Sequence, residues 1–267
     1  MGAYGTANNL GSVNKELLEI LEQLSTGYRV NSAADDPAGL AVWTNLNSQQ
    51  VSTRQAVRNA NTGISVAQTA ESAYDQVAHL LTSMRSLAVQ SSSGTLTTAD
   101  RADIDAEYQE LLSEIDRIAD GTEFNGIALT DGSTTSMSVQ VGAGTSASDS
   151  IAITLGDANI AALSINSTSV TSTSNAGSAI TAIDTALDSV NGYRSDVGAS
   201  QRRLESAVDL GSDYADNLAA AQSSIRDVDM AYAAAEATRL EIVQTASLSV
   251  LAQTQSMSRD LAAMLFA

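Results

Sequence analysis

Few residues of this 267-residue sequence could support catalysis or metal binding. The chain contains one histidine, His79, and no cysteine. A histidine-based zinc site needs more than one imidazole, and the lack of cysteine excludes thiolate ligands and cysteine nucleophiles. A Ser–His–Asp triad would depend on His79, which lies in a helical pattern beside Leu80 and Leu81. The sequence therefore predicts no enzyme activity, no metal and no cofactor.

Two adjacent carboxylates, Asp35 and Asp36, precede the only proline, Pro37. A carboxylate pair could act as general acid and base. However, an Asp before Pro is typical of a helix start, where the carboxylate accepts hydrogen bonds from free N–H groups and proline costs no bond. We therefore interpret the pair as a cap for a helix that begins at Pro37.

The sequence Gly142–Ala–Gly144 resembles part of a dinucleotide-binding fingerprint, which requires a helix directly after the glycines. Residues 136–141 and 150–155 instead alternate as two short strands. The glycines are thus predicted to form the turn of a β-hairpin.

Residues 125–175 are rich in Ser, Thr, Gly and Asp. This composition leaves two interpretations open, a small surface excursion or partial disorder. Asn166 begins a sequon for N-linked sugar, but the neighbouring hydroxyls are the favoured sites for O-linked sugar. The candidate O-glycosylation sites are Ser167, Thr168, Ser169 and Thr171.

The charge and hydropathy of the chain narrow its partners. A net charge of −18 argues against nucleic acid and anionic membranes, which bind basic surfaces. No apolar stretch is long enough to span a membrane. Residues 1–6 lack the basic and apolar regions of a signal peptide, so any export is expected to use a route without a cleaved leader.

The elements that remain are long helices. Hydrophobic residues make up 43% of the chain but aromatics only 4%, which suits helices packed closely side by side. Helical patterns run from Pro37 to about Gln90, from Thr97 or Thr98 to Gly121, and from about Ala176 onward. The seam of the last of these holds Ile183, Leu187, Val190, Val197, Leu204, Val208, Ala215, Leu218 and Ile225, with Arg194, Gln201 and Gly211 between them.

Apolar stripes also follow the two ends of the chain, where they predict inner helices that pack between subunits. Residues 1–14 and 242–258 carry no charged side chain. Such a surface suits a helix enclosed by other helices, because no charge has to be desolvated. Since these helices are marginal alone, our hypothesis is that they fold only on joining neighbouring copies. The predicted packing residues are Leu10, Val13, Leu17, Ile20, Leu24, Leu240, Val243, Ala246, Val250, Met257, Leu261 and Met264.

The predicted fold is mainly α, a long antiparallel helical bundle or coiled-coil rod with a small β-hairpin excursion in mid-chain. Residues 1–36 and 226–267 would form a discontinuous inner coiled-coil domain. Residues 37–130 and 176–225 would form a rod-like middle domain. Residues 131–175 would be a short variable region, with no large outer domain.

Several ordered segments resemble bacterial flagellin and together cover about four-fifths of the chain. They are Leu24–Ala41, Arg58–Glu71, Arg85–Gln90, Phe124–Ile127, Gly198–Glu205 and Ser249–Gln253. The resemblance implies a secreted subunit that polymerises with itself into a hollow extracellular filament for swimming. It also implies a flagellar export apparatus, a chaperone on the C-terminal helix, a filament cap and hook-junction proteins as partners.

The resemblance implies one further surface, the segment of the family that an animal innate receptor reads. Its counterparts here are Arg85, Leu87, Gln90 and Glu107, with Ser83 where the family often has a basic residue. We therefore expect weakened receptor activation. Three alternatives stay open from the sequence: a hook–filament junction protein, a secreted enzyme on the same frame, and an adhesin or immune ligand that uses the Ser/Thr-rich middle.

Overall fold

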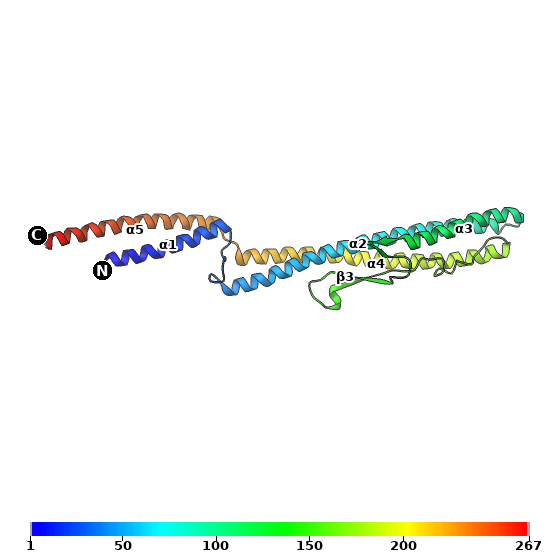
Figure 1. Cartoon of the computed structure of the whole chain (residues 1–267), viewed down its shortest axis with the longest axis horizontal. Helices are drawn as coiled ribbons and strands as arrows, with labels where there is room; N and C mark the ends of the chain where they lie inside the picture. Colours follow the sequence, from blue (N-terminus) through cyan, green and yellow to red (C-terminus); the bar gives the residue numbers. More distant parts are fainter. Residues whose placement is uncertain (1, 266–267) are drawn as a thin grey trace. The chain divides into compact units, whose positions relative to one another are not determined.

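The computed structural model describes residues 2–265, with the side chains of residues 2–4, 258 and 260–265 left aside. Five long helices account for most of the described chain, as the sequence predicts (Figure 1). They are α1 (Gly2–Thr26), α2 (Pro37–Ser91), α3 (Thr98–Gly121), α4 (Thr173–Arg226) and α5 (Met230–Leu265). The mainly α prediction is therefore confirmed.

Short strands occupy the segment between α3 and α4. Strands β1 (Glu123–Phe124) and β2 (Ile127–Ala128) form a tight hairpin, with Asn125 and Gly126 at positive φ. Strands β3 (Ser136–Gln140) and β4 (Ser150–Thr154) pair antiparallel across a turn that contains the short helix η1 (Ala147–Asp149). The predicted mid-chain hairpin is thus present.

The chain divides into two compact units. Unit 1 consists of residues 1–50 and 216–267, and unit 2 consists of residues 51–215. Both units are discontinuous or helical-hairpin in topology because α2 and α4 run through each of them. The following description treats each unit by itself.

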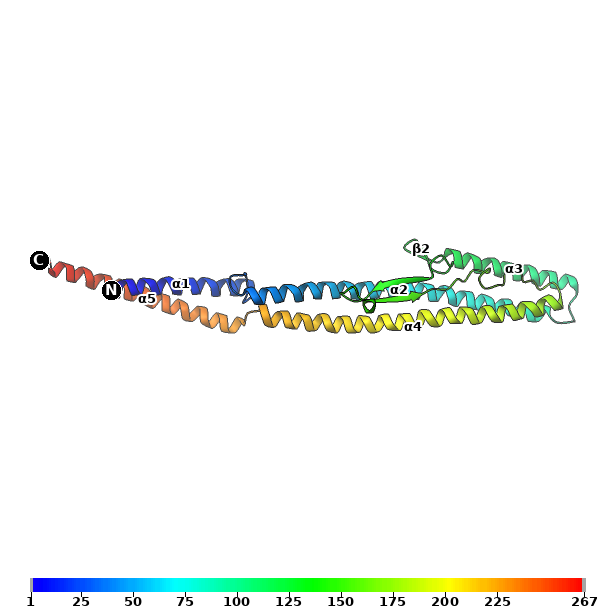
Figure 2. The same ribbon diagram turned by 90° about the horizontal axis from the view of Figure 1, so that it is seen from below.

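The core of unit 2 lies where α2, α3 and α4 run side by side (Figure 2). Small residues such as Ala67 and Ala70 let the helices approach closely, and large side chains from all three helices fill the space between them. On α4 the buried residues recur every seven positions, which is the spacing of a coiled-coil seam. Its fully buried members are Ile183, Val190, Val197 and Leu204.

The β3–β4 hairpin lies against the helices through alternate side chains. Val139 and Ile153 are buried, and the residues between them are exposed. Gly63 of α2 lies below the hairpin, and a Cβ atom there would come within 2.9 Å of Val139 Cγ2. The lack of a side chain at Gly63 therefore lets the hairpin settle onto α2.

Tyr74 fixes the segment that leaves the hairpin. Its hydroxyl donates to the carbonyl of Gly156 (2.8 Å) and accepts from the same residue's N–H (2.9 Å). The ring is fully buried, and burial raises the pKa of Tyr74 to about 12. Tyr193 packs beside it, with ring centroids 5.7 Å apart.

Replacing Tyr74 with phenylalanine should lower the free energy of unfolding of unit 2 by about 1–3 kcal/mol, because both backbone groups of Gly156 lose their partner. Chemical denaturation followed by circular dichroism would measure this change. Tyr232→Phe is the matched control, since that tyrosine is 69% exposed. Equal stability of the two variants would contradict the role assigned to the Tyr74 hydroxyl.

The predicted helix starts are confirmed in detail. Asp36 Oδ1 accepts from the N–H of Gly39 (2.9 Å), and Asp35 Oδ2 accepts from the N–H groups of Asn31 and Ser32 (3.0 and 2.8 Å). The Asp pair therefore organises the turn before α2, which leaves no acid–base role for it to explain.

The start of α3 carries a capping box. Thr97 Oγ1 accepts from the N–H of Asp100 (3.3 Å), and Asp100 Oδ2 accepts from the N–H of Thr97 (2.9 Å). This is the reciprocal arrangement that Thr97 and Asp100 predict from the sequence.

The same box predicts a pH dependence. Hydrogen bonds from the backbone of Thr97 lower the pKa of Asp100 below its ordinary value of 3.8. A lowered folded-state pKa gives stability that is complete above 3.8 and is lost as the pH falls through the lowered value. The stability difference between the wild type and Asp100→Ala should therefore shrink on acidification. A difference that stays constant or grows in acid denaturation series would contradict this linkage.

Candidate functional site

The terminal helices α1 and α5 pair within unit 1, as Figure 1 shows in blue and orange to red. Their shared core has three buried residues, Leu17, Ala237 and Leu240. Among the polar contacts, Gln244 Nε2 donates to Asn14 Oδ1 at 2.7 Å. A pair with so few buried side chains gains little free energy from its own packing.

The predicted stripe residues divide into three groups. Leu17 and Leu240 are buried in the pair, and Leu10, Val13, Ile20, Leu24 and Val243 are half-buried. Three members are exposed: Ala246, Val250 and Met257. The side chains of Leu261 and Met264 lie outside the described residues.

A second apolar face of the pair was missed by the stripe analysis. Leu18 is 69% exposed and Ile242 is 64% exposed, on the sides of α1 and α5 that turn away from the shared core. The signal that could have found them is the lack of charge around them, which frees more than one face for packing. Large apolar side chains in water mark a surface that a partner covers. Its other members are Leu21 and Leu248.

The receptor-like residues lie in unit 2 on α2 and α3. Arg85 Nε forms an ion pair with Asp184 Oδ1 at 2.6 Å, and that carboxylate raises the pKa of Arg85. Leu87 packs partly against the core, whereas Gln90 and Glu107 are exposed. Arg85 is thus held in place by a partner on α4 that sequence reasoning did not identify.

The candidate O-glycosylation residues differ in how far their hydroxyls are engaged. Thr168 Oγ1 lies 2.7 Å from Tyr108 Oη and also donates to the carbonyl of Ile165. Ser169 Oγ and Thr171 Oγ1 both accept from Asn175 Nδ2 (3.2 Å each). Ser167 is exposed.

The loop around these hydroxyls is packed into unit 2. Leu163, Ile165 and Val170 are buried in the core, and the N–H of Val170 donates to Asp105 Oδ1 at 2.6 Å. Such contacts favour an ordered excursion over the partial disorder that composition left open.

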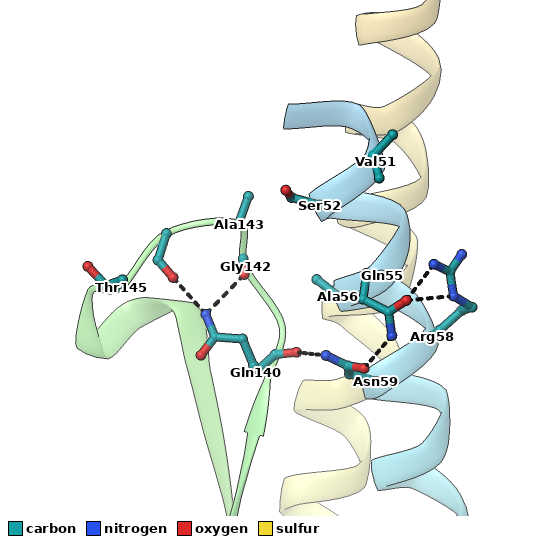
Figure 3. A pocket seen from close by; sticks show the side chains of 11 residues that line it. Val51, Ser52, Gln55, Ala56, Arg58, Asn59, Gln140, Gly142, Ala143 and Thr145 are labelled. Carbon is teal, nitrogen blue, oxygen red and sulfur yellow. Dashed lines mark hydrogen bonds between the residues drawn. The ribbon is translucent and has the colours of Figure 1, made fainter. Parts of the chain in front are cut away.

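The glycine-rich turn forms one wall of a pocket over α2 (Figure 3). Gln140 Nε2 donates to the carbonyls of Gly142 and Gly144 (3.0 and 2.8 Å), and Asn59 Nδ2 donates to the carbonyl of Gln140 (3.4 Å). The N–H of Gly142 donates to the carbonyl of Asp149 (3.0 Å). These groups hold the turn together, and the turn leads into β4, whereas a dinucleotide fold needs a helix there.

The residues that could do chemistry are scattered. His79 is exposed on α2, with Nε2 3.5 Å from Asp75 Oδ2, and Asp75 also pairs with Arg194 at 2.9 Å. Within the part of the chain that the structure describes, no group of three acidic or histidine side chains could hold a metal ion. None of its described helices is apolar over a length that would cross a membrane.

Long helices with little core of their own and apolar faces left in water define a class of protein, the subunit that packs with further helices. Comparison with known families places the chain more closely. The family model for the bacterial flagellin N-terminal helical region matches residues 1–135, and that for the C-terminal helical region matches residues 180–265. The chain belongs to the bacterial flagellin family.

Relatives support the same assignment along the whole chain. Flagellin of Halalkalibacterium halodurans is 41% identical over 251 residues, covering 94% of this chain and 92% of the relative. The flagellar filament 33 kDa core protein of Treponema phagedenis is 34% identical over 279 residues, covering 99% and 98%. The crystal structure of Bacillus cereus flagellin is similar with a TM-score of 0.52 and 29% identity, covering 57% of this chain and 88% of that one.

Membership of this family fixes the function. The chain is a structural subunit of the extracellular flagellar filament, which turns as a propeller in swimming, and it is not an enzyme. The predictions of a self-polymerising filament protein and of its location are therefore confirmed. The alternative of a secreted enzyme on the same frame is excluded.

Proposed function

We propose that the subunit polymerises chiefly through α1 and α5, which line the inside of the filament. The observation that carries this proposal is the small core of the α1–α5 pair, beside exposed apolar side chains such as Leu18 and Ile242. Neighbouring copies would cover these faces and supply the burial that the pair lacks. The exposed stripe residues Val250 and Met257 then make contacts between subunits.

The division of labour along the chain follows from this proposal. Residues 1–36 and 226–267 form the inner coiled-coil domain, residues 37–130 and 176–225 form the rod, and residues 131–175 form the outward excursion. Packing in unit 2 is extensive enough for it to keep its fold without a filament around it.

Further partners follow the exposed apolar helix. A cytoplasmic chaperone would cover α5 before export, because its apolar face would otherwise promote premature association. The flagellar export apparatus, the filament cap and the hook-junction proteins complete the set of partners. We also propose a weak receptor-reading surface at Arg85, Leu87, Gln90 and Glu107, and O-linked sugar first at the exposed Ser167.

Negative-stain microscopy of concentrated protein tests the assembly proposal, and filaments are expected. A variant that lacks residues 257–267 should remain monomeric while the thermal unfolding of unit 2 stays unchanged. Filaments from the truncated chain would contradict the role given to the end of α5. A wild-type chain that stays monomeric at high concentration would instead favour the hook–filament junction alternative.

A further inference from the structure

Two connections meet at one end of the α1–α5 pair, both within unit 1. Residues 27–36 link α1 to α2, and residues 227–229 link α4 to α5. Tyr28 and Asp227 form an isolated antiparallel bridge between them. We call residues 27–30 and 225–228 the joint.

The backbone of the joint is held by two short-range bonds. The N–H of Arg29 donates to the carbonyl of Arg226 (2.6 Å), and the N–H of Val228 donates to the carbonyl of Gly27 (3.0 Å). Gly27 has a φ of 76°, which lets the chain turn sharply after α1. A ladder of this length is marginal in water, so side chains must hold the joint closed.

Arg226 supplies that contact. Its Cζ atom lies 4.1 Å from the ring centroid of Tyr28 and 4.1 Å from that of Trp43, so the guanidinium is sandwiched between two aromatic rings. Its Nε also donates to the carbonyl of Val30 (3.2 Å), a residue whose side chain is buried. Arg29 adds a bond across the joint, from Nη2 to the carbonyl of Ile225 (2.7 Å).

This geometry does more than fill space. A planar guanidinium can stack on two rings at once, and each stack gains strength where water is partly excluded. Tyr28 belongs to the first connection, Trp43 to the first turns of α2 and Arg226 to the end of α4. One side chain therefore ties three segments that are far apart in the sequence.

We infer that Arg226 is a positioning residue that latches the joint shut in the free subunit and so holds α1 and α5 together at one end. The buried residues Leu17, Ala237 and Leu240 lie in the parts of the two helices nearest the joint. Tethering at that end raises the effective concentration of one helix near the other, which a pair with a small core requires. The consequence for filament growth rests on the proposed function of α1 and α5.

Hydrogen exchange on the full-length monomer tests the latch, read at the amides of Arg29 and Val228. Arg226→Ala should lower their protection by about 5- to 30-fold, the loss expected for two stacked cation–π contacts. Arg226→Lys should give an intermediate value, since it keeps the charge but loses the planar group and the Nε donor. Arg117→Ala is the matched control, because its ion pair with Glu114 lies on the surface of α3.

Fluorescence gives a second readout, because Trp43 is the only tryptophan of the chain. Arg226→Ala should shift its emission to the red and make it more accessible to acrylamide, whereas Arg117→Ala should change neither. Unchanged protection of the joint amides in Arg226→Ala would overturn the inference. An equal loss of protection at the buried core residue Val77 would also overturn it, since that result describes general destabilisation.

Filament growth separates the latch from the proposed function. Wild-type filaments together with slow growth of Arg226→Ala, partly restored in Arg226→Lys, are expected. A variant with an opened joint that grows at the wild-type rate would overturn the positioning role. Failure of the wild type itself to polymerise would count against the proposed function, while the exchange result would still decide the latch in the monomer.

Discussion

Replacing Leu240 with aspartate is expected to separate α1 from α5 and to stop filament growth. Leu240 is 2% exposed and packs with Leu17 and Ala237, the other two buried residues of the pair. Loss of the buried leucine alone costs about 2–5 kcal/mol, and an unpaired carboxylate in its place adds to that cost. A pair with three buried side chains has no reserve to absorb such a loss.

Two measurements check this prediction. Circular dichroism of the monomer should show fewer helical residues than in the wild type, while the thermal transition of unit 2 stays in place because its core is separate. Electron microscopy should show no filaments. Leu240→Met is the control, since it nearly conserves volume and should still assemble. Wild-type growth by Leu240→Asp would show that the α1–α5 pair is dispensable.

Regular elements of this fold could be predicted from the sequence because periodic patterns encode them directly. The seam of α4 was predicted through Ile183, Val190 and Val197, and these three residues are fully buried. Arg194 was placed between them on the same seam, where it forms an ion pair with Asp75. Caps at Asp36 and Thr97 were predictable for the same reason, since their chemistry is local.

Contacts between distant segments could not be predicted in this way. The sandwich of Tyr28, Trp43 and Arg226 joins residues that no short-range pattern relates. The loop that follows β4 reads as a polar excursion, yet its Leu163 and Ile165 enter the core, because irregular segments bury single side chains without a period. The candidate site shares this limit: a stripe identifies one face of a helix and is silent about the others.

Ile242 provides the sharpest test of those other faces. It lies two residues from Leu240 on α5 and is 64% exposed, on a stretch from 242 to 258 without any charged side chain. Ile242→Asp is expected to leave the free subunit unchanged, since substitutions in water alter stability by about 0.5 kcal/mol or less. It should nevertheless raise the concentration needed for polymerisation by roughly tenfold or more, because neighbouring helices would bury the carboxylate.

The comparison of the two aspartate variants separates pairing from assembly. Leu240→Asp should change both the helicity of the monomer and the growth of filaments, whereas Ile242→Asp should change growth alone. Ile242→Leu keeps the apolar character and should assemble like the wild type. If Ile242→Asp polymerised normally while Leu240→Asp failed, the outer face of α5 would make no contact between subunits. An effect on growth alone would instead mean that this helix is enclosed on more than one side in the filament, which explains why the chain keeps charge away from it.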